Sequence, residues 1–127
     1  MNNKSEKSKR IIYWVLTGLV AFVFLGSAAG KLIANEEALK MAAGFGLDAR
    51  TYTTLGILEV LSIILFIIPR TGTVGTILLV AYMGGAIATH LEHGESIIVP
   101  CIVQTFVLIV AFYRFPELRT KIINSKS

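Results

Sequence analysis

A glutamate in the middle of an apolar segment is the residue of this sequence that most needs a chemical explanation. Glu59 is the one charged residue between Arg50 and Arg70. A charged side chain at the centre of a membrane helix costs about 2.5 to 3.5 kcal/mol even on the scale that penalises it least. Such residues mark ligand, proton or ion sites, and the alternative is a neutral or hydrogen-bonded glutamate that only fixes helix packing. We expect Glu59 to belong to a functional site.

Polar residues in the other apolar segments could reach Glu59. Lys31 follows the first segment, Thr89 and His90 end the third, and Gln104 lies within the fourth. At 1.5 Å per residue, Glu59 and Gln104 lie about 13 and 16 Å from the inner ends of the helices. Thr89 and His90 lie at about 22 to 24 Å, and Lys31 at about 30 Å.

The directions of the side chains reduce the differences in height between Glu59 and these polar residues. Because Cβ atoms lean toward the N-terminus of their own helix, Glu59 leans toward the outer side of the membrane, whereas His90 and Lys31 lean inward. Lys31 still needs a tilt of the helices to meet Glu59. The sequence therefore predicts a ligand-binding or polar cluster in the outer half of the protein, formed by Glu59, Thr89, His90, Gln104 and Lys31.

Four apolar segments must position these side chains. The 127-residue chain is 54% hydrophobic and 16% charged, with a mean hydropathy of +0.71, whereas soluble domains carry about 25% charged residues. A helix of about 20 apolar residues spans the hydrocarbon of a bilayer. We predict an all-α integral membrane protein, an antiparallel four-helix transmembrane bundle over residues 11–115, with basic tails over 1–10 and 116–127. The spans are expected at 11–29, 48–68, 74–90 and 97–115.

The first segment has a rival interpretation as a signal peptide, because it follows a basic tail and ends in small residues. The apolar cores of signal peptides measure about 7 to 15 residues. This segment is longer, so we expect it to be retained as a span.

The connection between the first two spans carries the signals of a short interfacial helix. Asn35 is placed as its N-cap, Glu36 and Glu37 occupy its first turn, and Gly44 stands at its C-terminal end. Asp48 then resembles the N-cap of the second span.

The basic residues predict how the bundle is oriented. Under the positive-inside rule, cytoplasmic loops carry the excess of Lys and Arg. With the N-terminus inside, only Lys31, Lys40 and Arg50 lie outside. We therefore expect a multi-pass protein of the plasma membrane with both termini in the cytoplasm. The inner side then holds Lys4, Lys7, Lys9, Arg10, Arg70, Arg114, Arg119, Lys121 and Lys126.

Small residues recur in the first and third spans. Gly26 and Gly30 form a small-xxx-small pair, and Gly84 and Gly85 are adjacent. Such residues allow helices to approach closely. We expect them to pack the spans of one chain together, and a homodimer face is the alternative.

Several classes of function are excluded or disfavoured by composition. A single cysteine, Cys101, permits no intrachain disulfide and no dithiol redox pair. The basic residues flank apolar runs, so membrane anchoring explains them better than nucleic-acid binding. His90 and His93 share one loop with two glutamates, but two histidines alone do not predict a metal site. No phosphate-binding loop or nucleophile elbow occurs, so we expect a non-enzymatic protein without a cofactor.

Four motifs, in their order and spacing, resemble the DoxX-like family of small four-span membrane proteins. They are Gly-Lys-Leu at 30–32, Leu-Gly-x-x-Glu at 55–59, Ile-Ile-Pro at 67–69 and Met-Gly-Gly-Ala-x-x-Thr-His at 83–90. The resemblance covers about residues 10–114. Carried over residue by residue, it singles out Lys31, Glu59, Thr89 and His90.

The resemblance implies a role beside redox chemistry. The family's namesake is a subunit of a thiosulfate:quinone oxidoreductase, other members accompany thiol-stress or quinone-detoxification proteins, and a distant animal relative assists receptor assembly. The sequence shows neither a haem ligand pair nor a flavin motif, which argues against independent redox catalysis. The leading hypothesis is an accessory subunit of a membrane redox or stress system, or a binder of a lipophilic molecule such as a quinone. The alternatives are a proton-coupled four-helix exporter and a membrane-protein assembly factor.

Overall fold

The computed structural model describes residues 2–123 as a succession of helices. Of the predicted tail over 1–10, residues 2–10 form the start of the first helix. The tail over 116–127 is described as far as Ile123, so that Lys126 lies outside the described residues. The elements are α1 (Asn2–Ile33), α2 (Glu36–Gly44), α3 (Ala49–Ile67), the 3-10 turn η1 (Pro69–Thr71), α4 (Gly72–Glu92), α5 (Ile98–Arg114) and α6 (Pro116–Ile123).

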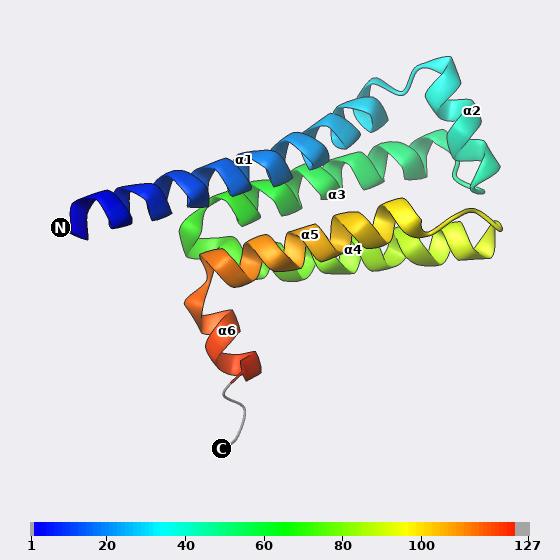
Figure 1. Cartoon of the computed structure of the whole chain (residues 1–127). Coiled ribbons are helices and arrows are strands. Elements are labelled where there is room, and N and C mark those ends of the chain that lie inside the picture. Colours follow the sequence, from blue (N-terminus) through cyan, green and yellow to red (C-terminus); the bar gives the residue numbers. More distant parts are fainter. Residues whose placement is uncertain (1, 124–127) are drawn as a thin grey trace.

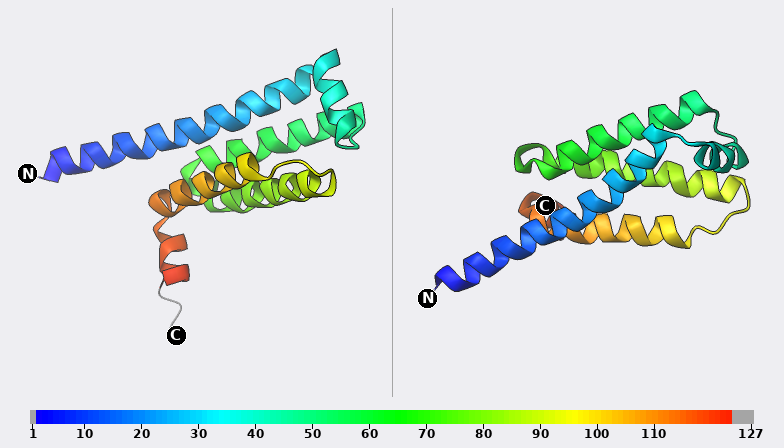
Figure 2. Two further views of the ribbon diagram at one scale, coloured as in Figure 1. Left: turned by 45° about the vertical axis from the view of Figure 1, so that its right-hand side comes forward. Right: turned by 90° about the horizontal axis from the view of Figure 1, so that it is seen from above.

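Four of these helices form an antiparallel bundle. Consecutive long helices run in alternating directions, with α1 beside α3, α3 beside α4 and α4 beside α5, and α1 also touches α5 (Figures 1 and 2). The prediction of an antiparallel four-helix bundle is therefore confirmed. We call the end where α1 begins and α5 stops the terminal end, and the opposite one the α2 end, where α2 joins α1 to α3 (Figure 1).

Large apolar side chains cover much of the outer surface of the bundle. Phe24, Phe66 and Leu79 are almost fully buried, yet Phe22 is 80% exposed and many other large apolar side chains face outward. Among the described residues, three helical segments are long and apolar enough to cross a membrane: α1, α3, and η1 together with α4. The pair formed by α5 and α6 also meets this criterion, although a bend of 102° separates the two helices. The outward apolar surface suits contact with lipid.

The helix ends near α2 follow the sequence signals. The Asn35 side chain accepts a hydrogen bond of 2.8 Å from the backbone N–H of Ala38, and the Asp48 side chain accepts one of 2.8 Å from Thr51. Both predicted N-caps are confirmed. The helix α2 ends at Gly44 as predicted, whereas the left-handed conformation occurs two residues later, at Gly46 with φ of 74°.

The glycines that permit close helix contact are not those predicted. A Cβ atom at Gly75 on α4 would overlap the backbone of Phe66 on α3, and one at Gly72 would overlap the ring of Phe115. A Cβ at any of the four predicted packing positions meets nothing within 4 Å. The prediction that they pack the spans of one chain together is wrong because they face outward, and the homodimer face remains a prediction. These outward positions are Gly26, Gly30, Gly84 and Gly85.

A buried arginine joins α5 to α3 at the terminal end. Arg114 is 4% exposed, and its guanidinium donates hydrogen bonds to the carbonyls of Phe66 at 2.7 Å and Ile67 at 3.1 Å. These carbonyls belong to the last turn of α3, where helices lack internal donors. The guanidinium also lies 4.7 Å from the ring centroids of both Tyr13 and Phe115, a cation–π arrangement. Arg114 thus works as a structural cap.

Candidate functional site

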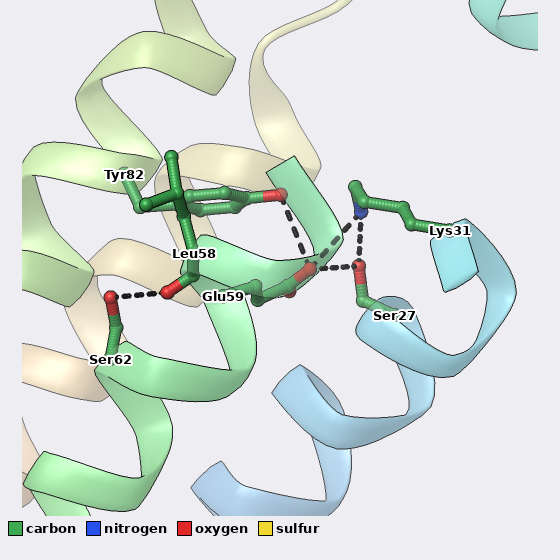
Figure 3. Close-up of polar contacts among 6 residues, drawn as sticks. All are labelled: Ser27, Lys31, Leu58, Glu59, Ser62 and Tyr82. Atoms are coloured by element: carbon green, nitrogen blue, oxygen red, sulfur yellow. Dashed lines mark hydrogen bonds and ion pairs between the residues drawn. The ribbon is translucent and has the colours of Figure 1, made fainter. Parts of the chain in front are cut away.

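The carboxylate of Glu59 is almost fully buried and lies where α1, α3 and α4 meet. Its Oε1 atom accepts hydrogen bonds from the hydroxyls of Ser27 at 3.3 Å and Tyr82 at 3.2 Å. The Lys31 ammonium lies 3.3 Å from the same oxygen (Figure 3). We call Glu59, Lys31, Ser27 and Tyr82 the Glu59 cluster.

Lys31 is held in the cluster by its own helix and by two aromatic rings. Its ammonium donates a hydrogen bond of 2.7 Å to the hydroxyl of Ser27, one turn earlier on α1 (Figure 3). The same ammonium lies 5.8 Å from the ring centroid of Tyr52 and 5.9 Å from that of Tyr82, within cation–π range. These contacts hold the cation on the side of the bundle where Glu59 lies.

Gly56 allows α1 to approach α3 closely enough for this pairing. A Cβ atom at this position would lie 2.9 Å from the Cβ of Lys31. Gly56 precedes Glu59 by three residues and therefore shares its helix face. The Leu-Gly-x-x-Glu pattern thus has a local explanation, because the glycine makes room for the backbone that carries the cation.

The cluster offers both charge and hydrogen-bonding capacity inside the bundle. A buried carboxylate is tolerated when a cation and hydrogen-bond donors compensate for lost hydration, and Glu59 has all of these. All three contacts use Oε1, and no donor from the described residues is bonded to Oε2. The arrangement can therefore present an anionic acceptor beside an ammonium donor to a third group.

The structure leaves three of the predicted cluster members apart from Glu59. The Thr89 hydroxyl donates to the carbonyl of Gly85 at 2.9 Å, and Nδ1 of His90 is hydrogen-bonded to the carbonyl of Ala86 at 2.7 Å, both on α4 itself. The amide of Gln104 donates to the carbonyl of Val80 at 3.2 Å and thereby links α5 to α4. Of the five predicted residues, the structure brings Lys31 and Glu59 together.

His90 instead belongs to a contact at the α2 end. Its ring centroid lies 4.8 Å from that of Phe45, the residue after α2, and the ring of His93 lies 6.0 Å from the same phenyl group. Nδ1 of His93 is hydrogen-bonded to the carbonyl of Thr89 at 2.9 Å. The two histidines thus pack the end of α2 against the end of α4.

Two members of the cluster, Ser27 and Tyr82, were not predicted from sequence. Ser27 lies four residues before Lys31, and residues at this spacing share one face of a helix. That spacing could have identified it. Tyr82 carries a hydroxyl group in the interior of an apolar span, and a buried tyrosine hydroxyl usually has a hydrogen-bond partner.

Comparison with known proteins gives a match to a family model. A search of the curated proteins finds none, and a search of the solved structures finds none either. The family model that matches describes the DoxX-like family and covers residues 15–112, a range that includes every member of the Glu59 cluster. Because the match extends over most of the 127 residues, the chain belongs to the DoxX-like family.

Proposed function

We propose that this protein is a non-enzymatic membrane component that binds a lipophilic small molecule with a polar head group, such as a quinone, at the Glu59 cluster. It would act as an accessory component of a membrane redox or stress system. The observation that carries the proposal is the ion pair of 3.3 Å between Lys31 and Glu59 within an apolar bundle. Intramembrane ionisable residues usually serve a ligand, a proton or an ion.

Access to the cluster is from the side of α1. Ser27 is exposed, and the side chain of Lys31 retains 16% of its exposure, whereas Glu59 is buried behind them. A molecule dissolved in the bilayer would therefore meet the hydroxyl and the ammonium first. The apolar surface around them suits the chain or ring of such a ligand.

The chemistry of a quinone matches the groups of the cluster. A quinone carbonyl accepts hydrogen bonds, which the ammonium of Lys31 and the hydroxyl of Ser27 can donate. A quinol hydroxyl donates, and Oε2 of Glu59 can accept. The cluster could bind either form without supplying electrons itself.

The test uses purified protein in lipid nanodiscs with decylubiquinone as the probe. We expect the probe to raise the melting temperature of the wild type and to remain bound in native mass spectrometry. The variants Glu59→Gln and Lys31→Met should lose most of this effect. Lys40→Met, on α2, removes an exposed lysine elsewhere and should behave as the wild type. Absence of binding to the wild type, or equal binding by all variants, would reject the proposal.

A proton-coupled exporter is the second candidate, favoured by the burial of Glu59 near the middle of α3. Proton coupling requires this carboxylate to change its protonation state during transport. Substrate-driven proton movement in proteoliposomes that disappears in Glu59→Gln would support the exporter and replace the binding role.

We also propose that the protein resides in the plasma membrane with the terminal end in the cytoplasm. The excess of basic residues at that end supports this orientation. In a Cys101→Ser background, a cysteine introduced at Ser5 should resist a membrane-impermeant maleimide applied to intact cells. A cysteine at Ser96 should react. The reverse pattern would reject the orientation.

A further inference from the structure

A second feature with binding chemistry lies at the terminal end, away from the Glu59 cluster. A groove of about 510 Å³ opens between the N-terminal half of α1, the end of α5 and the start of α6. We call it the terminal groove. It is lined by three basic residues, Lys9, Arg10 and Arg119, by three aromatic residues, Tyr13, Trp14 and Tyr113, and by Pro69 of η1.

The charge of the terminal groove is of one sign. None of the residues that line it is acidic. Across residues 2–123, the single ion pair joins Lys31 to Glu59, so the cations of the groove have no carboxylate partner there. Three like charges gathered at one opening repel each other, and an anion bound between them would relieve this repulsion.

The position of the terminal groove along the helices matches the boundary between lipid and water. Lys9 and Arg10 immediately precede Ile11, which is 56% exposed and begins the apolar surface of α1. Tyrosine and tryptophan collect at this level in membrane proteins, and Trp14 is 46% exposed there. Because α6 is bent by 102° from α5, Arg119 lines the groove together with residues of α1 instead of lying farther along the bundle axis.

The walls of the terminal groove are fixed by internal contacts. The Tyr113 hydroxyl donates a hydrogen bond of 3.3 Å to the carbonyl of Lys9, which connects α5 to α1. The Tyr13 hydroxyl accepts one of 3.2 Å from the buried Arg114. The rings of Tyr13 and Trp14 meet edge to face at 5.0 Å. A site whose walls are already ordered loses little conformational freedom when it binds a ligand.

We propose that the terminal groove binds the phosphate head group of an anionic membrane phospholipid. The three cations contact the phosphate, and the aromatic side chains contact the glycerol and the first methylene groups of the acyl chains. Basic pockets between helix ends are typical sites for anionic lipids. The aromatic half of the groove favours a lipid over a soluble phosphate, which has no apolar part to place there.

The test compares nanodiscs of phosphatidylglycerol with nanodiscs of phosphatidylcholine. We expect the wild type to melt at a higher temperature in phosphatidylglycerol and to retain one such lipid in native mass spectrometry. The triple variant Lys9→Gln, Arg10→Gln, Arg119→Gln should lower this retention by about tenfold or more. The matched variant Lys4→Gln, Lys7→Gln, Lys121→Gln removes the same charge outside the groove and should retain the lipid.

Three results would overturn the proposal. Equal loss of lipid in both triple variants would show that only net charge matters. Equal retention in both would show that the groove is not the site. An equal rise in melting temperature from inorganic phosphate in phosphatidylcholine discs would assign the groove to a soluble anion. Arg119→Gln alone, an exposed change on α6, provides the measurement if the triple variant does not fold.

Discussion

Lys31 on α1 and Glu59 on α3 are paired at 3.3 Å, and the cation is the more exposed partner of the two. Removing one member of a buried ion pair leaves the other charge uncompensated, whereas removing both does not. A comparison of the stabilities of the single and double variants therefore tests whether the two charges compensate each other.

We expect Lys31→Met to destabilise the protein by about 3 kcal/mol, because it leaves the Glu59 carboxylate in the bundle without its cation. The double variant Lys31→Met, Glu59→Gln should recover much of the loss. Thermal unfolding followed by circular dichroism in detergent measures both. Additive losses in the double variant would contradict the pairing.

The contact between α3 and α4 predicts a second effect. Gly75→Ala places a methyl group against the backbone of Phe66 and should cost about 1 to 3 kcal/mol. Gly85→Ala, in the same helix, meets nothing within 4 Å and should leave stability unchanged or slightly raised. Both are measured by thermal unfolding. A loss in Gly85→Ala would instead indicate that this face packs against a second copy.

The cap formed by Arg114 predicts a third effect. Arg114→Gln should destabilise the protein by about 3 kcal/mol, because it removes charge-assisted hydrogen bonds to the carbonyls of Phe66 and Ile67. Arg114→Lys should recover little, since lysine cannot reproduce the planar fork that contacts both carbonyls. The control is Arg70→Gln, an exposed residue of η1, with unfolding in detergent as the readout. Full stability of Arg114→Lys would contradict the cap.

The N-cap of α3 predicts a dependence on pH. The hydrogen bond from the backbone N–H of Thr51 lowers the pKa of the Asp48 carboxyl below its ordinary value of 3.8. A lowered pKa in the folded state means that the stabilisation is present above the unfolded pKa and is lost as pH falls through the folded pKa. The difference in melting temperature between wild type and Asp48→Ala should therefore be largest near neutral pH and shrink below about pH 4.

Asp48→Asn serves as the control for this titration. Asparagine is also a good N-cap, but its side chain carries no titratable charge. Its melting temperature relative to Asp48→Ala should not vary with pH. A wild-type difference that stays constant down to pH 2 would show that Asp48 acts through hydrogen bonding alone.

Much of the architecture could be predicted because its signals are local. Apolar length identifies the spans, and an Asn or Asp before a helical pattern identifies an N-cap, as at Asn35 and Asp48. The charge of Glu59 within an apolar segment identified that residue, and the family motifs singled out Lys31 and Glu59 together with Thr89 and His90. None of these signals requires knowledge of how the helices are rotated about their axes.

The remaining predictions depended on how each helix is rotated about its own axis. Axial height placed Gln104 and His90 closer to Glu59 than Lys31, but height does not say which face of a helix meets which neighbour. Their side chains bond to helix carbonyls instead. A small residue likewise allows close contact only where a neighbour lies over it, which is true of Gly75 and not of Gly85.

The unbroken length of α1 has a mechanical consequence. This helix runs from Asn2 to Ile33 and carries Lys9 of the terminal groove and Lys31 of the Glu59 cluster. The two residues lie about 33 Å apart along its axis at 1.5 Å per residue. Because one continuous helix carries both residues, any displacement of α1 at the membrane surface would also displace Lys31 in the interior of the bundle.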